Sequence, residues 1–240
     1  MPMPDPQLII VTKIAVVYER LRNVYEVPDR EPCSNPVGQL VSTILSQNTS
    51  DVNTARSYAS LTQTFATWRD VMTAPFEKVV DVIRSGGLAK QKTKYIQQAL
   101  QRIYQARGDF DLSWLAILPV GEARKWLTSL PGVGNKTASI VLLFCFGQPA
   151  FPVDTHVHRV TRRLGLAPAS ASPDRVMRVM EEYAPSAWFY ALHLNLIRYG
   201  RQVCKARSPR CQSCILSDLC DCYQSLQKEG ANQTKKPSLC

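Results

Sequence analysis

LPGVGNKTASIVLLFCFG, residues 130–147, is the stretch of the sequence that most constrains the fold. It starts with a proline and two glycines and continues as an almost unbroken apolar run, which predicts a tight turn followed by a helix. The segment before it, GEARKWLTSL, also has a helical pattern. Two helices that are separated only by Pro131, Gly132, Val133 and Gly134 form an αα-hairpin.

A lysine, Lys136, stands in the first turn of the second predicted helix. A helix start presents unpaired N–H groups that can bind a phosphate, although the glycines could equally serve only a tight connection. The helix dipole disfavours a cation there, so Lys136 is not placed to stabilise the helix. That dipole and a partly apolar surrounding favour the neutral amine, as a nucleophile requires. Position alone leaves two interpretations open, an amine nucleophile and a solvated lysine that contacts a phosphate.

Helical spacing recurs on both sides of this hairpin, and no strand pattern competes with it. The first helix has an apolar stripe at Ile10, Ile14, Val17, Leu21 and Val24. Ser34 or Asn35 is expected to cap a helix that opens at Pro36, and Thr49 or Ser50 to cap the next one. We expect about ten helices, an all-α fold, and a flexible polar tail from Tyr223 onwards.

Composition and charge restrict the class of protein. A chain of 240 residues with 45% hydrophobic and 20% charged residues is expected to be globular. The net charge of +10 favours a polyanionic partner, although basic solvated surfaces are common. We find no signal peptide or membrane span and expect a cytosolic protein, in which structural disulfides are not expected.

A second polar position, Asp154, lies eighteen residues beyond Lys136 in FPVDTHVHRV. It precedes a predicted helix with an apolar stripe at Val153, Val157, Val160 and Leu164. Aspartate is a favoured N-cap, so capping alone explains it, but capping and catalysis are compatible.

Four cysteines near the end of the chain have the spacing of a metal site. Cys204, Cys211, Cys214 and Cys220 stand in CKARSPRCQSCILSDLC, with intervals of six, two and five residues. In a reducing compartment this cluster indicates Cys₄ metal ligation, but the spacing alone does not identify the metal. Outside the pattern are Cys33, Cys222, Cys240 and Cys145, of which the last is expected in the core.

LPGVGNKTA, VDTHVHRV and the cysteine quartet together resemble the endonuclease III family of helix-hairpin-helix DNA glycosylases, from about Leu40 to Cys220. The resemblance implies a two-lobed fold with a six-helix domain over residues 30–147. A discontinuous iron-sulfur cluster domain would combine residues 1–29 and 148–222, with residues 223–240 as a flexible tail. It also implies that the four cysteines hold a [4Fe-4S] cluster.

The resemblance assigns Lys136 as the catalytic lysine, Asp154 as the catalytic aspartate, and residues 131–134 as the DNA-binding hairpin. Either Gln47 or Asn48 would fill the gap left by a flipped base, with Gln47 preferred for its reach, or both could merely lead into the next helix. Leu88 would press into the opposite strand as a second wedge, although Gly86 replaces a bulky apolar residue often found there.

Further DNA contacts are expected from the cysteine segment and from one histidine. The cations Lys205, Arg207 and Arg210 between the first two cysteines could face the DNA backbone. His156 could lie near a phosphate, or it could simply be packed or on a helix surface.

The expected activity is base excision repair of oxidised pyrimidines, by a lysine Schiff base and β-elimination at the abasic site. The alternatives are a monofunctional adenine or thymine mismatch glycosylase of the same fold and a non-catalytic DNA-binding module. We expect double-stranded DNA with damaged bases or abasic sites as the partner, no membrane, a monomer, and a bacterial-type cytoplasmic location at the nucleoid.

Overall fold

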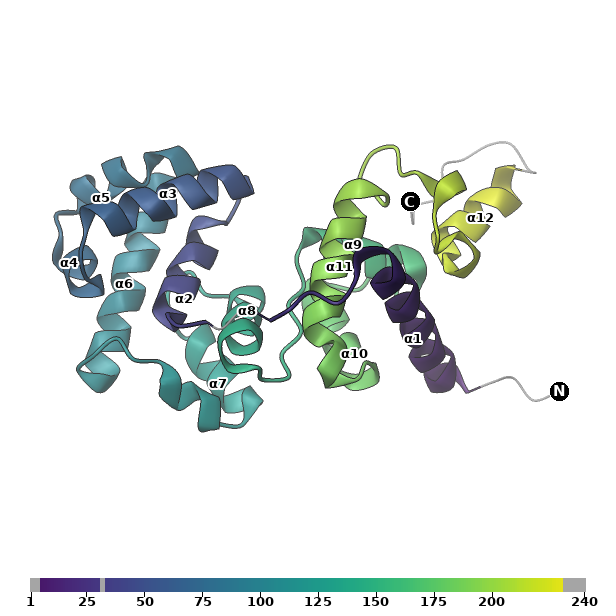
Figure 1. Cartoon of the computed structure of the whole chain (residues 1–240), viewed down its shortest axis with the longest axis horizontal. Coiled ribbons are helices and arrows are strands. Elements are labelled where there is room, and N and C mark those ends of the chain that lie inside the picture. Colours follow the sequence, from purple (N-terminus) through teal and green to yellow (C-terminus); the bar gives the residue numbers. More distant parts are fainter. Residues whose placement is uncertain (1–4, 31–32, 231–240) are drawn as a thin grey trace. The chain divides into compact units, whose positions relative to one another are not determined.

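The computed structural model describes residues 5–30 and 33–230, and the chain divides into two compact units. Glu31–Gln148 form one unit, here called the hairpin unit. The other, here called the cysteine unit, combines Met1–Arg30 with Pro149–Cys240. The described residues form helices and no strand, which confirms the all-α fold class (Figure 1).

The hairpin unit is a helical core in which α6 and α8 each pack against other helices. Its α-helices are α2 (Pro36–Leu45), α3 (Asp51–Thr64), α4 (Trp68–Thr73), α5 (Phe76–Val82), α6 (Ala89–Arg107), α7 (Val120–Thr128) and α8 (Asn135–Phe146), with 3₁₀ turns η1 (Arg84–Gly86) and η2 (Ser113–Ile117). α2 packs against α8, and both α4 and α5 pack on α6. Leu40, Ile96 and Leu142 are fully buried between them, so the apolar run of α8 lies in the core of this unit.

Local signals in the sequence place several of these helix ends. Asn35 caps α2, since its side-chain oxygen accepts a hydrogen bond from the Gly38 amide at 2.7 Å. Ser50 caps α3 in the same way through the Asn53 amide at 3.3 Å. Gly108 ends α6 with a left-handed φ of 80°, which glycine adopts without a steric penalty.

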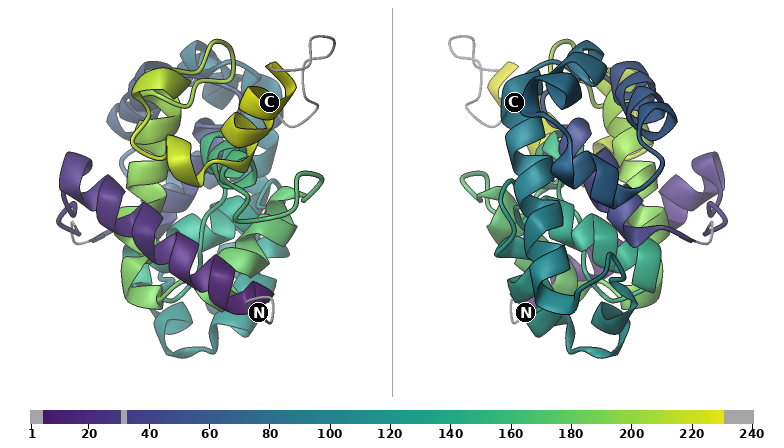
Figure 2. Two further views of the ribbon diagram at one scale, coloured as in Figure 1. Left: turned by 90° about the vertical axis from the view of Figure 1, so that its right-hand side faces the viewer. Right: turned by 90° about the vertical axis from the view of Figure 1, so that its left-hand side faces the viewer.

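The cysteine unit is a second helical core. Its helices are α1 (Pro6–Tyr25), α9 (Thr155–Leu164), α10 (Pro173–Tyr183), α11 (Phe189–Gln202) and α12 (Asp221–Gly230), with 3₁₀ turns η3 (Ser186–Trp188), η4 (Cys211–Ser213) and η5 (Ser217–Leu219). α11 packs against both α9 and α1 (Figure 2). The predicted stripe of α9 is confirmed, because all four of its residues are buried.

The stripe predicted for the first helix is correct only in its middle. Ile14, Val17 and Leu21 are fully buried, whereas Val24 is 55% exposed. Val24 lies in the last turn of α1, and Tyr18 takes part in the core instead by stacking on Trp188 at 4.3 Å between ring centroids. The spacing of apolar residues in a sequence does not show how far along a helix the packing on its neighbours extends.

Two helices were not predicted from the sequence. α4 has six residues, too few for a periodic pattern, and is recognisable only by its capping box between Thr67 and Asp70. α12 corrects the expected start of the flexible tail, because residues 223–230 are helical. The rest of that tail, with Cys240, lies outside the described residues. Within the described ranges, no helix has the length and apolarity that a membrane span requires.

One disulfide corrects the expectation that none forms. Cys33 is bonded to Cys145, with 112 residues between them in the sequence. Cys145 was expected to be a core residue, but it is only half-buried, in the last turn of α8. Because α2 and α8 pack together, the segment just before α2 lies beside the end of α8. The bond thus joins the two ends of the hairpin unit.

Candidate active site and four-cysteine segment

The turn between α7 and α8 has the geometry that its glycines predict. Gly132 has a φ of 77°, and a Cβ added there would lie 2.5 Å from the ring of Tyr95. The Val133 amide donates to the Leu130 carbonyl at 3.1 Å, which closes the turn. Gly132 is therefore fixed both by its backbone conformation and by the close approach of α6.

The start of α8 has no side-chain cap. Gly134 is the N-cap and has no side chain that could accept from the first amides of the helix. Its φ of −96° is open to any residue, so Gly134, unlike Gly132, is not required by its backbone conformation. A Cβ there would meet nothing within 4 Å, so the glycine instead leaves room for a ligand. Lys136 is half-buried in this first turn.

The loop between α2 and α3 contacts this hairpin. The Gln47 side-chain amide donates to the Gly132 carbonyl at 2.9 Å, so Gln47 is engaged within the protein. Asn48 is exposed and has a left-handed φ of 52°. Of the two candidates for the gap in the duplex, Asn48 is the one that faces outward.

Leu88, in the loop before α6, resembles Asn48 in being exposed with a left-handed backbone. It is 53% exposed and has a φ of 50°, an uncommon combination for a large apolar residue. Gly86, which departs from the pattern of the family, is buried, and a Cβ there would lie 2.7 Å from Ser57 Oγ. Packing against α3 therefore excludes a larger residue at position 86.

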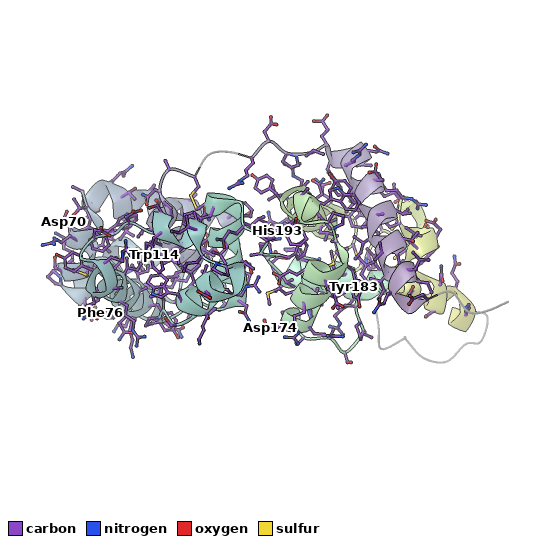
Figure 3. All side chains as sticks on the ribbon, turned by 90° about the horizontal axis from the view of Figure 1, so that it is seen from below. Asp70, Phe76, Trp114, Asp174, Tyr183 and His193 are labelled. Carbon is purple, nitrogen blue, oxygen red and sulfur yellow. A yellow bond between two sulfur atoms is a disulfide. The ribbon has the colours of Figure 1, made fainter. Side chains whose placement is uncertain are left out.

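Asp154 lies at the N-terminus of α9 in the cysteine unit. Its Oδ1 accepts from the Val157 amide at 2.7 Å, so the capping interpretation is correct. The residues before it are also held: His193 Nδ1, on α11 (Figure 3), lies 2.9 Å from the Pro152 carbonyl, and Glu181 accepts from the Phe151 amide at 2.8 Å. The sequence analysis missed His193 and Glu181, which carry no motif of their own.

Two arginines of α9 fix the segment that carries the first cysteine. Arg159 donates to the carbonyls of Cys204 at 3.0 Å and Gly200 at 2.8 Å. Arg163 is 6% exposed and donates to the Lys205 carbonyl at 2.7 Å. The sequence analysis missed both, although their spacing of four residues on one face of a predicted helix is a usable signal.

His156 contacts one of these arginines. Its Nδ1 lies 3.1 Å from a guanidinium nitrogen of Arg159, and the imidazole is half-buried. This contact supports a packing role for the ring and leaves the expected phosphate contact as a prediction.

The four spaced cysteines line a single cavity, together with Cys222, Arg163 and Tyr199. They are the free thiols of the described chain, whereas Cys222 is not among them. Among the described residues, no group of three His, Cys, Asp or Glu side chains is placed to hold a metal ion directly. Four cysteines around one cavity fit a cluster whose irons are each held by a cysteine thiolate.

The surroundings favour the protonated thiol at two of these four cysteines. Burial raises the pKa of Cys220 to about 11, and burial and the neighbouring cysteines raise the pKa of Cys211. The Tyr199 hydroxyl lies 2.6 Å from Cys214 Sγ. Metal binding must therefore displace protons from these sulfurs.

The cations between the first two cysteines are presented to solvent. Lys205, Arg207 and Arg210 are all exposed. Arg163 donates hydrogen bonds to the carbonyls of Lys205 and Ala206. These bonds fix the main chain at the start of the loop that carries the three cations.

Comparison with known proteins identifies the family. Residues 41–186 match the HhH-GPD superfamily of base excision DNA repair proteins, and residues 204–220 match the iron-sulfur binding domain of endonuclease III. The chain carries a [4Fe-4S] cluster.

Individual relatives agree. Endonuclease III of Thermotoga maritima is 31% identical over 204 residues, which span 85% of this chain and 91% of that protein. A solved non-covalent endonuclease III–DNA complex is 29% identical with a TM-score of 0.78, and the match covers 91% of this chain and 98% of the other. A trapped covalent endonuclease III–DNA intermediate also has a TM-score of 0.78 at 29% identity, covering 90% and 98% of the two chains. The chain therefore belongs to the endonuclease III family of base excision repair proteins and is a DNA-binding DNA glycosylase with a lyase role.

Proposed function

We propose that this glycosylase removes oxidised pyrimidines and cuts the resulting abasic site with one nucleophile, Lys136. The observation that carries the proposal is the start of α8, where an uncapped helix N-terminus and a lysine follow a tight turn. The main-chain amides at a helix start without a side-chain cap can bind a phosphate of the lesion strand, and the helix dipole disfavours a cation there. The trapped covalent state of the structural relative supports chemistry of this kind.

In this mechanism the Lys136 amine attacks the sugar C1′ as the base leaves with the electrons of the glycosidic bond. Asp154 stabilises the positive charge that develops on the sugar or accepts a proton from the amine. Ring opening gives a Schiff base, which acidifies the C2′ proton. Loss of that proton and of the 3′ phosphate is a β-elimination that cuts the strand.

We assign the DNA contacts to the exposed loops of the hairpin unit. Asn48 is preferred over Gln47 for the gap left by the flipped base, because it is exposed whereas Gln47 is bonded to Gly132. Leu88 is the second wedge, and its position in an exposed left-handed turn supports that role. An enzyme that acts on a base in duplex DNA must extrude the target nucleotide from the stack.

We assign Cys204, Cys211, Cys214 and Cys220 as the cluster ligands, since they line one cavity within the matched segment. The cluster supplies a rigid anchor for the surrounding loop. The exposed Lys205, Arg207 and Arg210 then meet the DNA backbone as a fixed group of cations. We further propose that the protein acts as a monomer at the bacterial nucleoid.

Borohydride trapping tests the nucleophile. With duplex DNA that contains an oxidised pyrimidine, the wild-type protein is expected to form a covalent complex, because reduction fixes an imine. Lys136→Gln is expected to abolish trapping and strand cutting. It should retain duplex affinity within about tenfold, since the hairpin amides remain.

Lys125→Gln is the matched control, because Lys125 is an exposed lysine on the other helix of the hairpin. Undiminished trapping in Lys136→Gln would place the nucleophile elsewhere. Base removal by the wild type without any trapping would favour a monofunctional mismatch glycosylase. Binding without base removal would favour a DNA-binding module.

A further inference from the structure

Lys92, in the first turn of α6, is a buried lysine that the catalytic proposal does not use. It is 2% exposed. Its Nζ donates to the Leu45 carbonyl at 2.7 Å and to the Gly86 carbonyl at 2.8 Å. Burial lowers the pKa of this amine, so placing it here is energetically unfavourable without its two carbonyl partners.

Both carbonyls terminate helical segments. Leu45 is the last residue of α2, and Gly86 is the last residue of η1. The carboxyl end of a helix leaves carbonyls without donors and carries partial negative charge, so a cation is favourable there. One ammonium group thus caps two helix ends that are more than forty residues apart in the sequence.

Each capped end leads directly into an exposed residue with left-handed backbone. Asn48 follows Leu45 by three residues with a φ of 52°, and Leu88 follows Gly86 by two with a φ of 50°. Non-glycine residues in this conformation are disfavoured and persist where the surrounding structure holds them. Lys92 is the side chain that contacts the base of both loops.

We infer that Lys92 is a positioning residue that sets the spacing between the Asn48 loop and the Leu88 loop, so that both enter the DNA duplex together. The inference rests on the proposed function, which assigns these loops to the gap and to the opposite strand. Lys92 itself does not contact DNA in this role. Its loss affects reactions that require the duplex to be opened and spares those that do not.

The test compares Lys92→Met with Lys94→Met. Methionine retains most of the packing of Lys92 but leaves both carbonyls without a donor. Lys94 lies on the same helix and is exposed, so its replacement removes the same charge without disturbing the loops. Two substrates are cut in parallel, a lesion within duplex DNA and an abasic site in a single strand, which has no partner strand to displace.

We expect Lys92→Met to slow the duplex reaction by about tenfold or more relative to the single-strand reaction. Lys94→Met should leave both rates, and therefore their ratio, unchanged. In parallel, 2-aminopurine placed opposite the lesion should report less extrusion with Lys92→Met than with the wild type. If Lys92→Met does not fold, Lys92→Gln is compared instead, because its amide keeps a donor near the carbonyls.

An equal loss on both substrates would overturn the inference and leave Lys92 as a core residue only. An unchanged ratio with unchanged extrusion would overturn it as well. If the wild-type protein itself neither extrudes a base nor cuts the abasic strand, the proposed function fails rather than the role of Lys92.

Discussion

The two helices that carry the proposed catalytic residues begin in opposite ways. α8 starts at Gly134, which supplies no capping side chain, and a lysine follows in its first turn. α9 starts at Asp154, whose carboxylate caps the helix through the Val157 amide. An open helix start can accept a phosphate from outside, whereas a capped one keeps its own carboxylate in a fixed position.

The supports behind the two helices differ as well. α8 is tied at its end by the disulfide between Cys145 and Cys33. α9 is tied through Arg159 and Arg163 to the segment that begins the four-cysteine site. The helix that begins near the proposed catalytic residue is therefore anchored by a covalent bond in the hairpin unit and by the four-cysteine site in the cysteine unit.

The largest effect is expected from removal of a cluster ligand. Cys211→Ser should lose the yellow-brown colour and about four irons per chain, together with helical structure in the cysteine unit and most of the duplex affinity. Iron analysis, circular dichroism and DNA binding measure this change. Ser213→Ala, between two of the cysteines, is the control. Stoichiometric zinc without iron in anaerobically purified protein would contradict the cofactor.

Breaking the disulfide is expected to be the next largest effect. Closing a loop of roughly 100 residues stabilises a fold by up to about 4.7 kcal/mol in the chain-entropy model. Cys33→Ser should lower the free energy of unfolding of the hairpin unit by an amount up to this value in a non-reducing buffer. Urea unfolding with and without a reductant measures it. A deficit that persists equally in reducing buffer would mean that the cysteine acts through packing and not through the bond.

Asp154 separates capping from catalysis. Asn is as good an N-cap as Asp, so Asp154→Asn should change stability little while slowing base removal roughly 10²- to 10³-fold through loss of the charge. Asp154→Ala should show the same slowing and a further loss of about 1 kcal/mol of stability. Single-turnover kinetics and thermal unfolding report the two quantities. Full activity in Asp154→Asn would reduce the residue to a helix cap.

The smallest effect is expected at the open start of α8. Gly134→Asp adds a capping carboxylate where the structure has room for a side chain, and it should stabilise the helix by a few tenths of a kcal/mol. The same carboxylate occupies and repels the site proposed for a phosphate, so duplex affinity should fall. Gly134→Asn caps without a charge and is the control. Equal affinities for the Asp and Asn variants would argue against a phosphate at this helix start.

Short-range signals made most of the fold predictable. The caps at Asn35 and Ser50, the stop at Gly108 and the stripe of α9 all depend on residues a few positions apart in the sequence. The hairpin was predictable for the same reason, because its turn and both helices are contiguous.

Contacts between distant segments were not predictable in this way. Lys92 and His193 meet carbonyls 47 and 41 residues away, and nothing beside either residue marks it as buried. The disulfide depends on the packing of α2 against α8, and the general expectation for a cytosolic protein argued against it. The difference in exposure between Gln47 and Asn48, on which the proposed preference for Asn48 rests, could not be read from two similar adjacent residues either.

The discontinuous cysteine unit has a consequence for synthesis of the chain. The hairpin unit is one continuous segment and can fold as soon as it leaves the ribosome. α1, which is made before the hairpin unit, packs on α11, which is made after it. At ordinary elongation rates the apolar stripe of Ile14, Val17 and Leu21 therefore waits on the order of ten seconds for its partner. During that interval the nascent N-terminal helix is a site for chaperones or for misassembly with a neighbouring chain.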